Sequence, residues 1–338
     1  MKILLANDTG RMPHVGCQAV SDGHARLLGR AGHDVVHRLF RGVLGRFVRP
    51  ADSDIVRAMA EDEALVAMID EADAVVVNGE GTLHHGAGRD LLGLLALAQN
   101  RGKASLLVNT GFQGTDGFAD TLARLDDFVV REPRSQAAAR ARGLDARIEP
   151  DSYLAARFEA GPSDALAGKE VVTDWQRQRE DVGAALDSFR LAHADSAVVM
   201  PLRFPEAARD WAAMPAAISR CRLLVTARHH GVYLAIVAGV PFIAMGSNTH
   251  KVEGTLEMLE LKDLFCEAAA ELEPARARAL ADPERFKGLR KRLNGGGLPD
   301  PFRALGSRGP EREAAEVRKL RADVAAAAAA EPGVRAAG

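Results

Sequence analysis

One stretch in the second half of the chain points to the type of fold, namely LLVTARHHGVYLA at residues 223–235. Five apolar or small residues lead into a polar turn, Arg228–Gly231, and a second apolar run follows, as expected for a buried strand that enters a helix directly. A histidine in such a turn can exchange a proton near neutral pH. An arginine beside it can bind a carboxylate or a phosphate. We therefore expect chemistry at this turn, with Gly231 allowing the helix to begin close to the strand.

The same alternation of short apolar runs and longer amphipathic runs continues on both sides of this stretch. Continuous apolar strands that alternate with helices predict a parallel sheet covered on both faces. In the first half the predicted strands are 3–6, 35–40, 74–77, 105–108, 128–130 and 146–148, and the predicted helices are 18–30, 54–71, 89–101 and 134–142. In the second half the predicted strands are 170–173, 197–200, 223–226 and 241–245, and the predicted helices are 181–193, 232–237 and 250–259.

This pattern predicts an α/β protein with two doubly wound, Rossmann-like domains that face a cleft. Gly161-Pro162-Ser163 interrupts the pattern. We therefore expect an N-terminal domain at 1–160, a C-terminal domain at 165–290, and a helical segment with an Ala-rich tail at 291–338. Ligands of such sheets bind outside the carboxyl ends of the strands, so the cleft is the expected site.

Composition limits the classes of function. The net charge of −2 argues against a nucleic-acid partner, although Arg38, Arg41, Arg46 and Arg49 form a local basic run. The three cysteines show no CxxC spacing, so no metal site, disulfide framework or cofactor is expected. No apolar stretch approaches the roughly 20 residues that span a bilayer. We expect a cytoplasmic protein, with peripheral contact at the inner face of the membrane as an option.

Four further segments follow predicted strands and are candidates for the site. The turn Gly79-Glu80-Gly81 could hold an anion on its backbone amides, or could be only a tight turn. The segment Asn109–Gly114 is open to the same two interpretations. Arg131 could bind phosphate or carboxylate, or could pair with Glu132 at the surface. Asp151 could act as a base, or could cap the next helix.

Lys251 begins a later predicted helix. Its amine could reach a phosphate, or could be a solvated lysine at the start of that helix. His84 and His85 are adjacent, and neighbouring side chains on an extended segment point in opposite directions, so the pair is not expected to chelate a metal.

Taken together, these motifs resemble the polysaccharide pyruvyl transferase family over about residues 2–262. The family pattern has a polar loop after the first strand, a Gly-rich turn, an Arg-acid pair with a nearby serine, a Pro-Asp, an R-x-H-G turn, an A-x-x-x-G-x-P segment and a lysine. Here these elements are Asn7–Gln18, Gly79-Glu80-Gly81, Arg131-Glu132 with Ser135, Pro150-Asp151, Arg228–Gly231, Ala235–Pro241 and Lys251.

The resemblance implies a GT-B-like fold and transfer of an enolpyruvyl-derived group from phosphoenolpyruvate to a saccharide, which forms a pyruvate ketal on a cell-surface or exopolysaccharide precursor. It implies that His230 is the acid that protonates the enolpyruvyl methylene, and that Arg228 and Arg131 hold the donor. His229 occupies the variable position of the R-x-H-G turn and is expected to pack. The acceptor sugar, its linkage to a lipid or polymer, and the oligomeric state stay open.

Two positions depart from the family pattern. Where the first loop has Asn-x-Gly-Asp, this chain has His14-Val15-Gly16-Cys17, and the middle glycine of the Gly-rich turn is Glu80. Glu80 is our candidate for the missing acid. Two other functions remain open: a GT-B-type glycosyltransferase that uses a sugar nucleotide, with Glu253 or Glu257 on the ribose, and a non-catalytic carbohydrate-binding relative.

Overall fold

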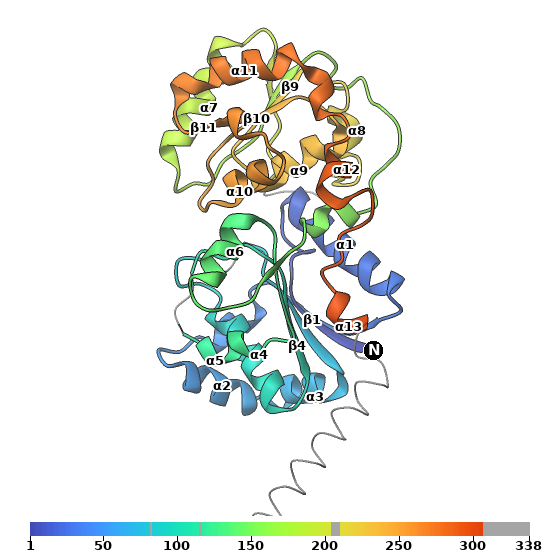
Figure 1. Ribbon diagram of the computed structural model, residues 1–338, viewed down its shortest axis with the longest axis vertical. Coiled ribbons are helices and arrows are strands. Elements are labelled where there is room, and N and C mark those ends of the chain that lie inside the picture. The colour runs from blue at the N-terminus through green and yellow to red at the C-terminus, as the bar shows by residue number, and fades with distance from the viewer. Residues whose placement is uncertain (82, 115–116, 204–209, 307–338) are drawn as a thin grey trace, which may run out of the picture. The chain divides into compact units, whose positions relative to one another are not determined.

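The computed structural model describes residues 1–81, 83–114, 117–203 and 210–306 (Figure 1). Residues Met1–Pro301 form one compact unit, and Phe302–Gly338 form a second. The second unit contributes α13 (Arg303–Gly306) to the described part of the chain. The Ala-rich tail and the part of the expected helical segment beyond residue 306 lie outside the described residues. The domain boundary near residue 160 stays a prediction.

The first half of the large unit is built on a six-stranded parallel sheet with the order β2-β1-β3-β4-β5-β6. Its central strands are buried along their whole length because helices cover both faces. The strands are β1 (Lys2–Asp8), β2 (Asp34–Phe40), β3 (Ala74–Asn78), β4 (Ala104–Thr110), β5 (Asp127–Val130) and β6 (Arg147–Ile148).

The four predicted helices of this half are present, one of them divided in two, and further short helices accompany them. The single helix expected at 54–71 is two helices, because Asp62 interrupts the first and caps the second by accepting a 2.9 Å hydrogen bond from the amide of Leu65. The helices are α1 (Val15–Arg30), η1 (Val43–Phe47), α2 (Asp52–Ala60), α3 (Glu63–Glu71), α4 (Arg89–Asn100), α5 (Ala119–Ala123), α6 (Pro133–Arg140) and η2 (Ser152–Ala155).

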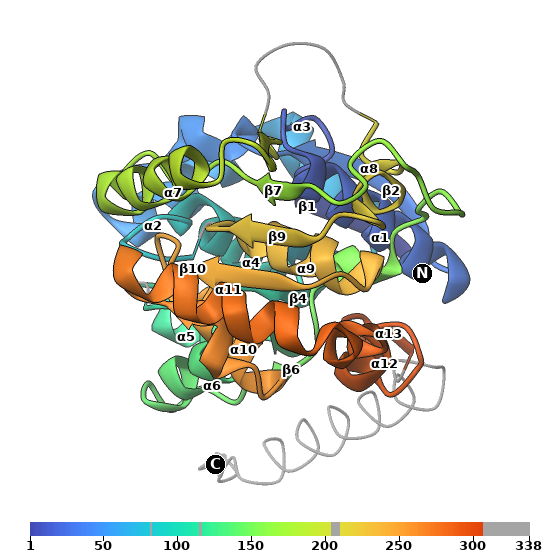
Figure 2. The ribbon, with the colours of Figure 1, turned by 90° about the horizontal axis from the view of Figure 1, so that it is seen from above.

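The second half is built on a five-stranded parallel sheet with the order β11-β10-β9-β7-β8. Figure 2 shows β7, β9 and β10 side by side, with α11 along β10. The strands are β7 (Glu170–Val172), β8 (Ala197–Val199), β9 (Leu223–Thr226), β10 (Phe242–Met245) and β11 (Phe265–Cys266). The helices are α7 (Glu180–Ala192), α8 (Met214–Ile218), α9 (His229–Ala238), α10 (Lys251–Met258), η3 (Lys262–Leu264), η4 (Ala269–Glu271), α11 (Leu272–Ala281), η5 (Pro283–Phe286) and α12 (Leu289–Asn294).

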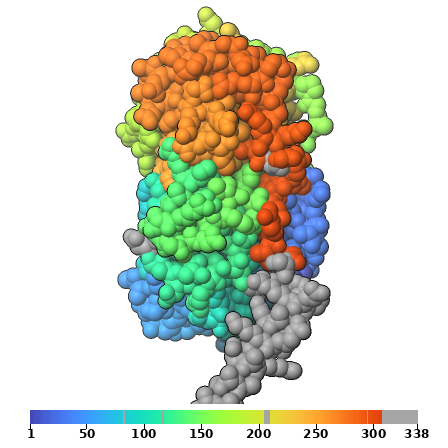
Figure 3. All heavy atoms as spheres, in the orientation of Figure 1, coloured from blue at the N-terminus to red at the C-terminus, as the bar shows by residue number. Residues whose placement is uncertain are grey.

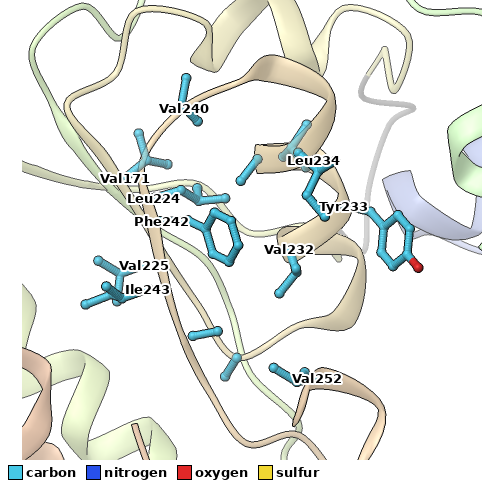
Figure 4. Packing of buried hydrophobic residues seen from close by; sticks show 14 of the residues in the cluster. Val171, Leu224, Val225, Val232, Tyr233, Leu234, Val240, Phe242, Ile243 and Val252 are labelled. Carbon is cyan, nitrogen blue, oxygen red and sulfur yellow. The ribbon is translucent and has the colours of Figure 1, made fainter. Parts of the chain in front are cut away.

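The core of the second half explains why α9 is apolar on all sides. Leu224 and Phe242 of the sheet pack against the helix, and Tyr233 points away from the sheet (Figure 4). Tyr233 instead reaches the first half, where its hydroxyl accepts a 3.2 Å hydrogen bond from the amide of Asp151. A helix that is buried on both sides needs no polar face.

Both sheets reverse their strand order at one place, between β1 and β3 in the first sheet and between β7 and β9 in the second. Such switch points leave a crevice at the carboxyl ends of the strands. The two halves meet through η2, which contacts α1 on one side and α9 on the other. They also adjoin at α6 and α10 on the face seen in Figure 3, where Arg134 pairs with Glu257 over 2.7 Å.

Candidate functional site

A cavity of about 170 Å³ lies where the segments that follow both switch points come together. It is small and is lined by cationic and imidazole side chains from both halves of the large unit. Its lining residues are Met12, Pro13, His14, Cys17, Arg41, Glu80, Gly81, Arg131, Gln176, Arg203, Arg228, His229, His230, Asn248 and Lys251. All of the predicted site residues except Asp151, Gly79 and Gly231 line it directly.

The Arg228 turn is built by its own backbone. Thr226 Oγ1 accepts a 3.1 Å hydrogen bond from the amide of Arg228, whose carbonyl accepts from the amide of Gly231, so α9 starts at His229 and three residues earlier than predicted. A Cβ at position 231 would lie 2.1 Å from Thr226 Oγ1, so only glycine fits there. The guanidinium of Arg228 pairs with Asp174 and donates to the carbonyl of Trp175 over 2.6 Å. Its buried Nε has no partner among the described residues.

His230 occupies the middle of the cavity wall. Its ring stacks on Tyr153 at 5.8 Å and packs against Gly16, where an added Cβ would come within 2.2 Å of the His230 ring. Its Nε2 lies 3.6 Å from Glu80 Oε1 and 3.6 Å from Asp151 Oδ2, and it makes no hydrogen bond within the described part of the chain. A ring held by packing, with an unpartnered nitrogen between two carboxylates, is suited to proton transfer.

Arg131 and Asp151 form an ion pair of 2.6 Å that is almost completely shielded from solvent. The predicted alternative, a surface pair of Arg131 with Glu132, is not formed, because Glu132 caps α6 by accepting from the amides of Arg134 and Ser135. Burial acts to raise the pKa of Asp151, but the charge of Arg131, the hydrogen bond from His229 and the nearby His230 hold that pKa well below its usual range.

Asp151 also caps the helix that follows it, which was the alternative role predicted from the sequence. Its Oδ1 accepts a 2.9 Å hydrogen bond from the amide of Tyr153 at the start of η2. The carboxylate therefore joins the strand ends of the first half to the histidines of the second.

His229 does more than pack, which corrects the prediction. Its ring is buried, yet it lines the cavity, and its Nε2 lies 3.2 Å from Asp151 Oδ2. Burial and the nearby charge of Arg131 lower its pKa to about 3, so the ring is neutral near pH 7 and donates to the carboxylate.

Glu80 is buried at the end of β3 and accepts three hydrogen bonds. Thr9 Oγ1 donates over 2.7 Å, Cys17 Sγ over 3.1 Å and Asn78 Nδ2 over 3.4 Å. Burial acts to raise its pKa, but the charges of His230 and Arg131 outweigh burial and lower it to about 2. Glu80 is therefore an ionised carboxylate that faces the cavity.

The two glycines that flank Glu80 have different roles. A Cβ on Gly79 would lie 2.2 Å from Thr110 Oγ1, so Gly79 permits close packing of two strand ends. Gly81 has a φ of +63°, which favours glycine in this turn. No residue of the segment 109–114 lines the cavity. The segment instead holds the start of η2 in place, because Asn109 Oδ1 accepts a hydrogen bond from the amide of Ser152.

Lys251 is buried, not solvated, at the first residue of α10. Its Nζ donates to Asn248 Oδ1 over 2.7 Å, and the side chain lines the cavity. Burial and the charges of Arg131 and Arg228 lower its pKa to about 7. The amine can therefore bind an anion when protonated and can also release its proton near neutral pH.

The sequence did not single out His14, Arg41, Gln176 or Arg203 as site residues. His14 caps α1 by accepting a 3.0 Å hydrogen bond from the amide of Gly16 at Nδ1. It also pairs with Arg203 through an isolated backbone bridge. Since Arg203 and Gln176 follow strands of the second sheet, only the facing arrangement of the two sheets reveals that they share a cavity.

One group of side chains in this cavity could hold a metal ion. His14, Cys17 and His230 each offer a ligand atom, and these atoms lie within 4.8 Å of one another. The sequence predicted no metal site, because the cysteines show no CxxC spacing and His230 is distant in the chain from His14 and Cys17. Among the described residues, no helix is long and apolar enough to cross a membrane.

The fold is shared with known sugar-nucleotide enzymes. A protein from Listeria monocytogenes assigned as a UDP-N-acetylglucosamine 2-epimerase has 14% identity and a TM-score of 0.56, with 90% of this chain and 93% of that chain covered. The UDP-GlcNAc 2-epimerase of Neisseria meningitidis, solved with UDP-GlcNAc, has 10% identity and a TM-score of 0.52, with coverages of 90% and 98%. The Methanocaldococcus jannaschii UDP-GlcNAc 2-epimerase has 9% identity and a TM-score of 0.53, with coverages of 91% and 99%. These likenesses confirm the predicted GT-B-like architecture of two Rossmann-like halves.

No curated protein matches the chain. The model of the family described as polysaccharide pyruvyl transferase matches residues 14–249, which is more than half of the chain. The match spans every predicted site residue except Lys251. The chain therefore belongs to the polysaccharide pyruvyl transferase family, and it is a transferase.

Proposed function

We propose that this protein transfers an enolpyruvyl-derived group from phosphoenolpyruvate to two hydroxyls of a saccharide, forming a pyruvate ketal. The observation that carries the proposal is the small cavity in which positive side chains from both halves surround His230. Those cations are Arg41, Arg131, Arg203, Arg228 and Lys251. Phosphoenolpyruvate carries a phosphate and a carboxylate on three carbons, so it suits fixed guanidinium groups at close quarters.

The size of the cavity supports a small donor. Its volume of about 170 Å³ is below the ~300 Å³ at which pockets for drug-sized ligands begin. A sugar nucleotide would need a larger space or an opening of the two halves.

Arg131 and Arg228 keep a donor group for the anion although each already has a carboxylate partner. In both, the buried Nε is without a partner in the described structure. The pairs with Asp151 and Asp174 fix the two guanidinium groups before the donor arrives. Groups fixed in this way need little reorganisation during the reaction.

His230 then supplies the proton. Transfer of its proton to the methylene carbon of phosphoenolpyruvate makes the adjacent carbon electrophilic. One acceptor hydroxyl adds to that carbon, its proton returns to His230, and phosphate leaves with its electron pair. A second hydroxyl then adds to the same carbon and its proton goes to the departed phosphate, so phosphoenolpyruvate and a diol become the ketal and inorganic phosphate.

Glu80 is our candidate to orient the acceptor. Its carboxylate is ionised and faces the same cavity as His230. With a pKa of about 2 it acts mainly by accepting a hydrogen bond from the attacking hydroxyl. The acceptor class we propose is a saccharide precursor of a cell-surface polymer, with lipid-linked and polymeric forms as the two options at the inner face of the membrane.

One observation favours a second candidate, a glycosyltransferase that uses a sugar nucleotide. Glu253 Oε2 on α10 is buried and without a partner among the described residues, and burial raises the pKa of this carboxyl. A ribose hydroxyl could form a hydrogen bond with that oxygen. Glu257 is less suited, because it pairs with Arg134 and Lys262.

Thermal unfolding with different donors separates the two candidates. A ligand at 100 times its Kd stabilises the folded state by about 2.7 kcal/mol. We expect phosphoenolpyruvate to raise Tm, and UDP- and GDP-sugars to leave it unchanged. If only the nucleotide sugars raise Tm, the pyruvyl transfer proposal fails. If neither class raises it, both fail and a non-catalytic carbohydrate-binding relative becomes the favoured interpretation, to be tested with oligosaccharides.

A further inference from the structure

The wall of the cavity holds a group of three metal-ligand side chains, and the proposed pyruvyl transfer uses only one of them, His230. His14, Cys17 and His230 place their ligand atoms within 4.8 Å of one another, and Cys17 and His230 are less than a tenth exposed. Imidazole and thiolate are the ligands that zinc prefers. Three protein ligands leave a fourth position open, as in zinc sites that bind a further ligand.

The two members of this group in the first loop, His14 and Cys17, differ from the residues of the family pattern. His14 and Cys17 occupy the first and last positions of the motif in which the family pattern has Asn and Asp. Neither an amide nor a carboxylate would favour a thiophilic metal over Mg²⁺ or Ca²⁺. The two replacements therefore introduce both loop ligands together, opposite a histidine that the pattern already contains.

We propose that His14, Cys17 and His230 form a binding site for a thiophilic divalent cation such as Zn²⁺, and that occupation of this site takes His230 out of the transfer reaction. On binding, the Cys17 thiol releases its proton to solvent, and one metal–sulfur bond and two metal–nitrogen bonds form. The carboxylate of Glu80, 3.1 Å from Cys17 Sγ, adds a second negative charge beside the cation.

Two of the cationic side chains that line the cavity are already paired with carboxylates. Arg228 is neutralised by Asp174 and Arg131 by Asp151. Lys251 donates its hydrogen bond to Asn248. The thiolate and Glu80 together offset the two charges of the metal.

Binding is expected to be reversible. His14 Nδ1 accepts from the backbone amides of Gly16 and Cys17, so coordination of this ring exchanges the cap of α1 for a bond to the metal. The affinity is therefore lower than that of a preformed structural zinc site. The effect on catalysis rests on the proposed function, because an imidazole that coordinates a metal cannot deliver a proton from the same nitrogen.

Cobalt absorption tests the site without any assay of activity. Co²⁺ is titrated into the chelator-treated full chain, and thiolate-to-cobalt charge transfer is followed in the near ultraviolet. We expect one equivalent to bind, Zn²⁺ to displace it, and Cys17→Ser and Cys17→Asp to lose the band. Cys221→Ser and Cys266→Ser are matched controls that should keep it, because these buried cysteines do not line the cavity. Absence of the band, or its persistence in both Cys17 variants, overturns the site.

The effect on the reaction has its own readout. Zn²⁺ should lower turnover of the parent at least tenfold, with recovery on adding a chelator, and should not change the turnover of the His14→Asn/Cys17→Asp variant. Turnover that is insensitive to Zn²⁺ under conditions where Co²⁺ binding is observed overturns the inhibitory role. If phosphoenolpyruvate fails to raise Tm in the metal-free protein, the proposed function fails while the cobalt result still decides the metal site.

Discussion

The thiol of Cys17 donates a 3.1 Å hydrogen bond to Oε1 of Glu80, and so joins the first loop of the chain to the turn after β3. Cys17 stands where the family pattern has an aspartate, and Glu80 stands where the pattern has a glycine. Their contact places the carboxylate of Glu80 beside the position from which a carboxylate at residue 17 would act. Glu80 is therefore our candidate for the acid that the family pattern has at the position of Cys17.

Glu80→Gln should lower turnover at least tenfold while leaving the Kd for phosphoenolpyruvate nearly unchanged. The amide preserves the shape of Glu80 but removes the negative charge that faces the acceptor. Steady-state kinetics and calorimetric titration of the donor measure the two effects. Cys17→Asp in the Glu80→Gln background restores a carboxylate at the family position and should recover part of the activity. Full activity of Glu80→Gln would exclude this role.

His230→Ala should bind phosphoenolpyruvate but turn it over 10²- to 10⁴-fold more slowly, which is the usual contribution of a positioned general acid. Inorganic phosphate release measures turnover, and ligand-induced change in Tm measures binding. His193→Ala is a suitable control, because His193 pairs with Glu273 at the surface and does not line the cavity. Unchanged turnover of His230→Ala would remove this residue from the mechanism.

Arg131→Met should destabilise the fold by about 3–5 kcal/mol, because it leaves the buried carboxylate of Asp151 without its partner. Urea unfolding measures the change. Arg57→Met, which breaks an exposed pair with Asp54, should cost less than about 1 kcal/mol. Equal losses for the two variants would show that the Arg131–Asp151 pair contributes little to the fold.

Stability should fall as the pH drops from about 6.5 toward 4. Burial lowers the pKa of His24 to about 4, so the folded protein keeps this ring neutral while the unfolded chain protonates it. Each pH unit in this window costs about 1.4 kcal/mol for this group. Urea unfolding of His24→Gln at several pH values should give a shallower slope than the parent. An identical slope would contradict the buried neutral state of His24.

Chelators should leave turnover of the purified protein intact or raise it, since the proposed proton transfer runs through His230 and needs no metal. Activity is compared before and after treatment with EDTA and after adding Mg²⁺ or Mn²⁺. Loss of turnover on chelation, with recovery on adding a divalent metal, would contradict metal independence.

The sequence predicted much of this molecule because its strands are buried and short. Ala74–Asn78 and Leu223–Thr226 lie within 1 residue of the predicted strands, since a continuous apolar run followed by a polar turn has few other interpretations. The helix break at Asp62 was missed because the apolar period continues across it, and only the side-chain cap ends one helix and starts the next.

For the site, the sequence identified residues that directly follow strands, and it missed contacts between the halves. Arg228, Arg131 and Glu80 could be chosen because strand ends of a parallel sheet meet at one edge. The bond of His229 to Asp151, and the approach of His14 to His230, depend on how two sheets face each other. No periodicity within one half carries that information.

Gly16 lies directly against the His230 ring, so the start of α1 contacts the start of α9 through this ring. This contact means that residue 16 and His230 cannot change independently. A larger residue 16 requires His230 to move, and a displaced His230 requires a different conformation of the loop at 14–17. Chimeras between relatives should therefore exchange residues 14–17 and 228–231 as one block, since the first loop of one parent and the histidine turn of another have not been selected to fit.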